Sequence, residues 1–247
     1  MAQKIFMVGG EVEPPFFIGR SEEIEKIKLD VLKLAQNNVI IGPRRIGKTS
    51  LLRNLRLSVK DDVLFTLINC REMASISDFF RITTKLLLEA YEEQHKIEGI
   101  AKKFTQVFKG KITTAYGSLS EIGGSIEHIG GIYLKFRDDE FNEQDLIAET
   151  FEFIDHFSKE KHLSIVLCFD EFQELRKFNG GIFNVLKSRM DSQPNVRYIF
   201  SGSSISLLHD VFLKPDSPLY LMASKMQLEP IKEEYVGKYI RQRLGIQ

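Results

Sequence analysis

Short apolar runs alternate along this chain with longer segments in which apolar residues recur every three or four positions. The runs predict strands at 38–41, 63–69, 164–169 and 197–200, and we expect a fifth strand at 225–229. The run at 164–169 is continuously apolar, which is typical of a parallel strand covered on both faces. Because helical segments separate the strands, the pattern predicts an α/β fold.

The helical segments are recognised by apolar residues spaced for one face of a helix. We expect Ser21 to cap the first of them, and Ser77 or Asp78 to cap the third. The last segment has little left to pack against. The predicted helices cover about 24–36, 48–57, 78–95, 99–108, 142–159, 181–190, 205–211 and 232–244.

Residues 97–141 interrupt the alternation of strands and helices. A short helix is expected first, and then a β-hairpin or small ribbon over 112–137. The paired glycines at 123–124 and 130–131 indicate turns rather than a second nucleotide loop, because no Gly-Lys-Thr follows them. We therefore interpret 97–141 as an insertion into the domain.

The first strand leads directly into the spacing G-x-x-x-x-G-K-T, and a helical segment follows. Glycines at both ends let successive backbone N–H groups converge on one anion, and the new helix adds the positive end of its dipole. The lysine reaches the outer phosphates and the threonine hydroxyl can ligate Mg²⁺. A chance match in an ordinary strand–turn–helix is the alternative. The predicted phosphate-binding residues are Gly42, Pro43, Arg44, Arg45, Ile46, Gly47, Lys48, Thr49 and Ser50.

An acidic pair, Asp170 and Glu171, follows the third strand. Asp170 stands where a carboxylate can hold Mg²⁺ across from Thr49, and Glu171 is placed to polarise the attacking water. The alternative is that the pair caps the next helix. With the loop upstream, the sequence favours the metal and the general base.

Two further polar residues close strands of the same predicted sheet. Ser203 follows the fourth strand, where its hydroxyl can touch the γ-phosphate or orient the water; a helix N-cap at Ser203 or Ser204 is nearly as good an interpretation. Asn69 closes the second strand and is a weaker candidate for a neighbour of the water.

The preference for adenine over guanine is indicated by a motif that the sequence lacks. No Asn-Lys-x-Asp motif for reading guanine follows a late strand, so ATP is favoured over GTP. Arg44 and Arg45 are unusual in a loop that only receives an anion. They face either solvent or a neighbouring protein surface.

Composition narrows the partners of the chain. Its 247 residues carry 34 basic and 34 acidic side chains, and this zero balance argues weakly against nucleic acid without excluding a local basic patch. Cys70 and Cys168 lie at or near the ends of apolar runs and are expected to be buried, reduced thiols. No stretch approaches 18 apolar residues and no signal-peptide pattern opens the chain, so we expect a cytoplasmic protein with no membrane segment.

Four linked motifs resemble one family. Phe-Ile-Gly-Arg at 17–20, the phosphate loop, Cys-Phe-Asp-Glu-Phe-Gln-Glu at 168–174 and Phe-Ser-Gly-Ser-Ser at 200–204 occur in this order. Over about residues 16–244 the sequence resembles the archaeal-type ATPases, a STAND branch of the P-loop NTPases that is akin to the AAA+ origin-recognition proteins.

The resemblance implies a three-layer α-β-α domain of the ASCE or AAA+-like kind. Its five-stranded parallel sheet would have the order 5-1-4-3-2, with a small β-ribbon inserted. Ile18, Gly19 and Arg20 would lie near the adenine and ribose, and Ser203 would be the sensor residue. Residues 1–229 would form the ATPase core, and 230–247 the start of a truncated helical lid.

Two departures from the family bear on turnover. Relatives continue past the last helix into a lid and a winged-helix domain, whereas this chain stops at Gln247. Relatives often carry Gly-Arg where this chain has Leu221-Met222. Both departures bear on efficient hydrolysis more than on binding.

The sequence therefore predicts a Mg²⁺-dependent, ATP-binding switch with slow ATPase activity, in which Glu171, Lys48 and Ser203 take part in catalysis. The alternative is a protein-interaction module whose ATP or ADP is structural. A nucleotide or small-molecule kinase is a weaker third option. A protein partner or self-association is expected in either of the first two cases.

Overall fold

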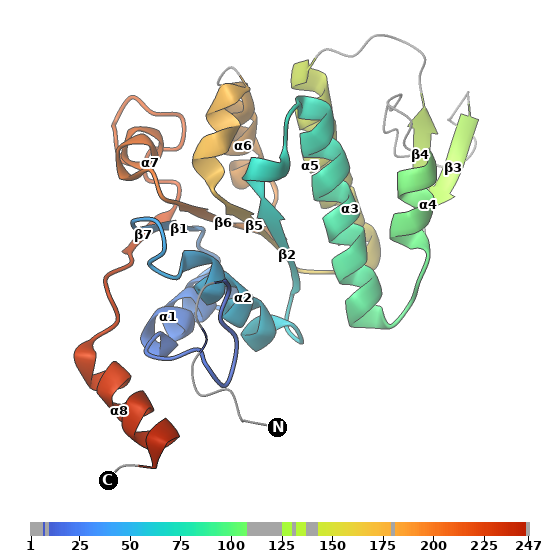
Figure 1. Ribbon diagram of the computed structural model, residues 1–247. Coiled ribbons are helices and arrows are strands. Elements are labelled where there is room, and N and C mark those ends of the chain that lie inside the picture. Colours follow the sequence, from blue (N-terminus) through green and yellow to red (C-terminus); the bar gives the residue numbers. More distant parts are fainter. Residues whose placement is uncertain are drawn as a thin grey trace.

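A five-stranded, all-parallel sheet forms the centre of the computed structural model (Figure 1). The structure describes residue 7 and residues 10–107, 125–129, 132–136, 143–178 and 181–245. The strand order is β2-β5-β6-β1-β7, and every neighbouring pair is parallel. The strands are β1 (Asn38–Ile41), β2 (Leu64–Asn69), β5 (Ile165–Asp170), β6 (Val196–Gly202) and β7 (Ser224–Gln227). This confirms the predicted order, with β6 between the loop strand and the Asp-Glu strand.

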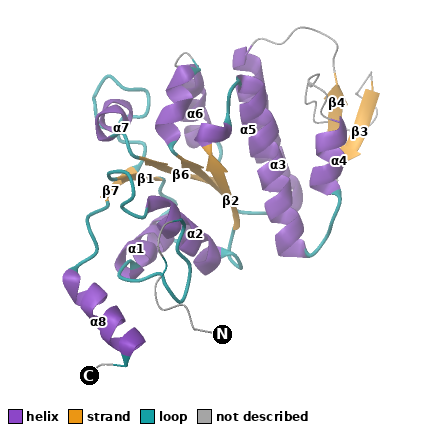
Figure 2. Ribbon diagram, viewed as in Figure 1, coloured by secondary structure: helices purple, strands orange, loops and turns teal. Residues whose placement is uncertain are grey.

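Helices cover both faces of this sheet and complete the three layers (Figure 2). One face carries α1 (Ser21–Leu32) and α2 (Lys48–Val59). The other face carries α3 (Ile76–His95), α5 (Glu143–Lys161), α6 (Gly181–Ser192) and α7 (Ile205–Phe212), and α4 (Ile100–Val107) packs on the outer side of α3.

The two cores differ in the side chains that fill them. Along β5, Ile165, Leu167 and Phe169 point to the α3 side, and Val166 and Cys168 point to the α1 side. This alternation follows from the period of two along a strand. The α3 side is rich in phenylalanine, while the α1 side is mostly aliphatic. Both cysteines are free and buried, as expected.

The predicted ribbon is present as a separate two-stranded sheet. β3 (Ser125–Ile129) pairs antiparallel with β4 (Ile132–Phe136), and neither strand joins the central sheet. The remainder of the predicted 112–137 hairpin lies outside the described residues.

Two helix starts differ from the prediction. Arg20, without a side-chain cap, precedes α1, and this helix ends at Leu32 rather than near residue 36. Ser75 caps α3 through a capping box with Asp78, so the choice of Ser77 or Asp78 as the cap was wrong. The signal was present as Ser-x-x-Asp, with aspartate in the place where Glu or Gln is more usual.

The last helix, α8 (Glu233–Leu244), contains no buried residue, as the sequence predicted. Two 3₁₀ helices, η1 (Cys70–Glu72) and η3 (Phe172–Lys177), follow the carboxyl ends of β2 and β5. Both therefore lie at the carboxyl edge of the sheet, where the predicted polar site residues also lie.

Candidate nucleotide and catalytic site

The predicted phosphate loop is the turn between β1 and α2. Gly47 precedes α2 in a left-handed conformation with φ of 98°, and Arg45 also has a positive φ, of 67°. A side chain at Gly42 would approach the carbonyl oxygen of Leu228 to 3.1 Å, so the loop passes close to the segment after β7. These positions explain why glycine occurs at both ends of the motif.

Lys48 is buried under this loop. Its Nζ donates to the carbonyl oxygens of Gly42, at 2.8 Å, and Pro43, at 2.9 Å. Burial lowers the pKa of Lys48, while the charges of Glu171 and Asp170 act in the opposite direction. The loop therefore holds an ammonium group close to its own backbone, next to two carboxylates.

A hydrogen bond joins the loop to the end of β5. Thr49 Oγ1 donates to Asp170 Oδ2 at 2.6 Å, and Ser201 Oγ of β6 makes a short hydrogen bond to Asp170 Oδ1. The predicted pair, Thr49 and Asp170, thus meets in space although 121 residues separate the two positions. Ser201 was missed; its only sequence signal is a hydroxyl directly after the run Tyr-Ile-Phe at 198–200 of β6.

Glu171 stands next to this pair in a left-handed conformation with φ of 53°. Its Oε1 pairs with Arg71 at 3.1 Å, and its Oε2 accepts from Ser203 Oγ at 3.0 Å. Gln173 Nε2 also donates to Oε2. The Glu171 side chain makes no cap hydrogen bond to η3, so the capping alternative for this residue is wrong.

Ser203 lies on the site rather than on the following helix. Ser204 is the residue before α7, and it makes no side-chain cap. Ser203 directs its hydroxyl at Glu171. Asn69 contacts its own strand end, accepting from the Arg71 backbone at 3.2 Å and donating to Glu72 at 3.0 Å.

A cavity of about 320 Å³ opens beside these groups. It extends from the threonine of the loop to the ends of β2 and β5. Its lining residues are Glu11, Thr49, Arg53, Leu67, Asn69, Arg71, Glu72, Leu86, Asp170 and Glu171.

A segment near the amino terminus is fastened to α2 at the rim of this cavity. The Val12 N–H donates to Ser50 Oγ at 3.0 Å, and Asn54 Nδ2 donates to the Val12 carbonyl at 2.8 Å. Arg53 also pairs with Glu11. The Ser50 hydroxyl therefore has a partner within the chain, which the sequence did not indicate.

The other predicted ligands lie on either side of the loop. Arg20 is buried and donates to the carbonyls of Glu229, at 2.6 Å, and Ile46, at 3.3 Å. Its guanidinium thus ties the loop to the segment after β7, while Gly19 lies against Ile231, which a side chain at Gly19 would meet at 2.7 Å. Ile18, Gly47 and Thr49 are half-buried, whereas Pro43, Arg44 and Arg45 are exposed.

Comparison with known proteins agrees with this geometry. A family model described as an ATPase domain predominantly from Archaea matches residues 17–242. The chain belongs to this family. A search of curated proteins found no match.

Solved structures share the fold of this archaeal ATPase domain. A Walker-type ATPase of Pyrococcus abyssi aligns with a TM-score of 0.65 at 19% identity, over 99% of this chain and 63% of that chain. The ORC2 protein of Aeropyrum pernix, solved in ADPNP-ADP complexes, aligns at 0.53 with 14% identity, over 97% and 54%. The ORC1 protein of the same organism, solved with DNA, aligns at 0.52 with 14% identity, over 94% and 50%. The chain spans less than two thirds of each of these structures.

The donor set of this archaeal ATPase domain suits Mg²⁺ bound together with phosphates. Mg²⁺ is usually held by one or two carboxylates plus substrate phosphates and waters, and Thr49 and Asp170 supply one hydroxyl and one carboxylate. Among the described residues, no group of three or more His, Cys, Asp or Glu could hold a metal ion without such a ligand. Nor does any described helix have the length and apolarity needed to cross a bilayer.

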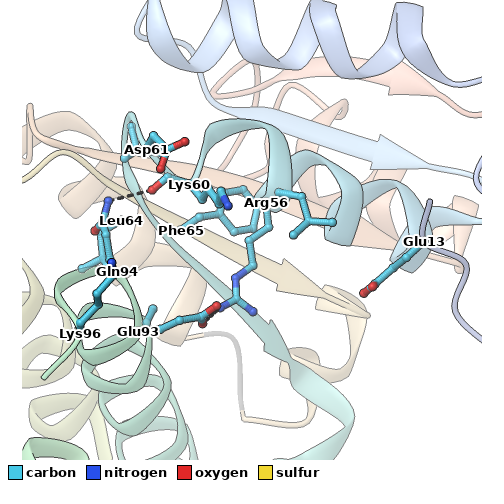
Figure 3. Close-up of a pocket in the computed structure, with 12 residues that line it drawn as sticks. Glu13, Arg56, Lys60, Asp61, Leu64, Phe65, Glu93, Gln94 and Lys96 are labelled. Atoms are coloured by element: carbon cyan, nitrogen blue, oxygen red, sulfur yellow. Dashed lines mark hydrogen bonds and ion pairs between the residues drawn. The ribbon is translucent and has the colours of Figure 1, made fainter. Parts of the chain in front are cut away.

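A second cavity lies at the other end of β2 and has a volume of about 440 Å³ (Figure 3). Arg56 and Glu93 point toward one another there, and Gln94 Nε2 donates to the Lys60 carbonyl at 2.9 Å. None of the predicted site residues lines it. The larger cavity is therefore separate from the chemistry predicted by the sequence.

Proposed function

We propose that this archaeal ATPase domain is a nucleotide-dependent switch that binds ATP with Mg²⁺ and hydrolyses it slowly. The carrying observation is the Thr49–Asp170 hydrogen bond, which joins the phosphate loop to the acidic end of β5. Glu171 and Ser203 lie beside this bond, each directly after one of two adjacent strands, β5 and β6. The ADPNP and ADP in the structurally similar ORC2 protein support the choice of an adenine nucleotide.

Each group has one role in this proposal. The loop N–H groups and Lys48 bind the phosphates, and Lys48 leaves the carbonyls of Gly42 and Pro43 to do so. Thr49 and Asp170 would hold Mg²⁺, which neutralises charge on the phosphate oxygens when bound. Glu171 accepts the proton of the attacking water, and Ser203 orients it. Ile18, Gly19 and Arg20 border the nucleoside, as the family resemblance implies.

The contacts of Glu171 support slow turnover. Arg71 pairs with Oε1 at 3.1 Å, and Ser203 and Gln173 both donate to Oε2, so each oxygen of this carboxylate already has a partner that competes with the attacking water. The sequence also has Leu221-Met222 where relatives often carry Gly-Arg. An arginine acting on the transition state can contribute about 10³–10⁵ in rate, so we expect turnover well below about 1 s⁻¹.

Calorimetry and phosphate release test this function together. ATP should bind with a dissociation constant that weakens when EDTA removes Mg²⁺, and free phosphate should appear only with Mg²⁺. An Asp170→Asn variant should lose most of the effect of Mg²⁺ on binding. Equal affinity with Mg²⁺ and with EDTA would contradict the metal site, and turnover of tens per second would contradict the slow switch.

The alternative is an interaction module whose nucleotide is structural. Its supporting observation is α8, which has no buried residue and exposes Val236, Ile240 and Leu244. Arg44 and Arg45 are exposed at the loop as well. Under this alternative ATP binds without phosphate release, so the same assay separates the two functions. The partner under this alternative is another protein or a second copy of the chain, because the zero net charge offers no support for a nucleic acid.

A further inference from the structure

Gln173 bridges the two strand ends that carry the proposed catalytic groups. Its Nε2 donates to Glu171 Oε2 and lies 3.5 Å from Ser203 Oγ. Ser203 Oγ donates its proton to the same Oε2 at 3.0 Å, so it remains free to accept from the amide. The 3.5 Å contact is long, so the bond to Glu171 is the stronger of the two.

The orientation of the amide follows from its partners. A carboxylate only accepts, so the NH₂ group faces Glu171 and Oε1 faces away. Oε1 is buried and has no hydrogen-bond partner among the described residues. Buried polar atoms usually have a hydrogen-bond partner, so the unpaired Oε1 lowers the stability of the fold. The side chain nevertheless keeps the orientation in which its Nε2 contacts the proposed catalytic groups.

Gly202 makes room for this amide. A Cβ at position 202 would lie 2.2 Å from Gln173 Oε1 and 2.8 Å from Leu208 Cδ1. The φ of Gly202 is not in the left-handed region, so the backbone does not require glycine here. The close approach of the glutamine does require it.

The geometry points to Gln173 as a positioning residue for hydrolysis. It anchors Oε2 of Glu171 at the end of β6 and so leaves Oε1, on the Arg71 side of the cavity, to face the water. It also couples the orientation of Glu171 to that of Ser203, which lies at the end of the neighbouring strand. This inference rests on the proposed ATPase function, because Gln173 acts only through the two proposed catalytic groups.

Two variants remove the bridge in different ways. Gln173→Met keeps the length of the side chain and deletes the donor. Gly202→Ala keeps the donor and displaces the amide, because the added Cβ meets the mobile ends of two side chains. We expect each to slow single-turnover hydrolysis by about tenfold to a hundredfold, since small misplacements of catalytic groups have effects of this size. The dissociation constant for Mg²⁺-ATP should change less than twofold.

Non-additivity gives a second measurement. If both substitutions break the same contact, the double variant should be no slower than Gln173→Met alone. Gln193→Met is the matched control, because the Gln193 amide also makes side-chain hydrogen bonds, to the Phe151 carbonyl at 2.8 Å and to the Tyr198 hydroxyl at 2.7 Å, but lies outside the site. It should lower the melting temperature and leave the rate per folded molecule unchanged.

The outcomes separate this inference from the proposed function. The ATPase function is supported if the wild-type protein hydrolyses ATP well above the rate of Glu171→Gln. If Gln173→Met is then as fast as wild type or faster, the positioning role is overturned and the ATPase function is not. Equal losses in affinity and in rate would also overturn it, because they indicate a role in binding. Wild-type protein no faster than Glu171→Gln would refute the ATPase function and the role of Gln173 together.

Discussion

The two cavities at opposite ends of β2 differ in chemistry far more than in size. The cavity at the carboxyl end has about 320 Å³ and contains carboxylates held by the groups around them. The cavity at the amino end has about 440 Å³, and its charged pair, Arg56 and Glu93, is largely exposed. Of these two cavities, the one at the amino end has the larger volume, whereas the arrangement of charge favours the one at the carboxyl end as the site.

The difference arises from the direction of the strands. At the carboxyl edge α2 begins, so its free N–H groups and the positive end of its dipole face the cavity. At the amino edge α2 and α3 end, so the negative ends of their dipoles lie at the edge where the other cavity opens. Non-glycine residues with positive φ occur at both edges and do not distinguish them: Arg45 and Glu171 lie at the carboxyl edge, and Lys96, at the end of α3, lines the cavity at the amino edge.

The largest expected effect is that of Glu171→Gln at the carboxyl edge. General-base catalysis contributes about 10²–10⁴ in rate, so single-turnover hydrolysis should fall by about that factor. ATP affinity should stay within about threefold, because Glu171 is not expected to hold the phosphates. Quench-flow with labelled ATP measures the rate. Hydrolysis at the wild-type rate would show that Glu171 is not the base.

The next effect is on binding. A charge-assisted hydrogen bond contributes about 1.5–3 kcal/mol, so Lys48→Ala should weaken ATP binding by about tenfold to a hundredfold or more. Lys60→Ala is the control from the amino-end cavity and should have no effect on affinity. Calorimetry on folded variants checks both. Unchanged affinity in Lys48→Ala would contradict the assignment of the phosphate loop.

The sequence was most informative where function and local pattern coincide. The loop from Gly42 to Thr49 is recognised from the spacing of its glycines, lysine and threonine. The apolar run before Asp170 indicates where a buried strand ends. The fold followed from these patterns together with the family resemblance, which supplied the strand order.

The rest depended on contacts between distant segments. Arg71 meets Glu171 only because β2 and β5 are neighbours in the sheet. Ser201 reaches Asp170 for the same reason, since β5 and β6 pair. The Val12 backbone docks on Ser50 and leaves no signal in the side-chain pattern. Sequence spacing fixes which residues share an element, but not which elements lie side by side.

The ribbon offers a third region against which to compare the two ends of β2. β3 and β4 pair only with each other, and neither joins the sheet that carries the site. Replacing residues 112–137 with a short Gly/Ser linker should therefore leave ATP affinity within a few-fold, since changes of loop length cost little entropy. Calorimetry on the folded deletion variant measures this. Loss of binding would place the ribbon within the site.

The smallest effect is expected from Arg56→Ala in the amino-end cavity. Arg56 pairs with Glu93, and both side chains are exposed, at 39% and 72%, so the pair contributes about 0–1 kcal/mol. At about 2–4 °C per kcal/mol for a domain of this size, the melting temperature should fall by no more than about 4 °C, and by less at high salt. The six residues of β2 separate the two ends by about 17 Å, roughly twice the screening length of about 8 Å at physiological salt. ATP affinity should therefore change less than twofold in calorimetry. A tenfold change in ATP affinity would mean that the two cavities are coupled through β2 and α2. They would then be two parts of one extended site rather than two separate regions.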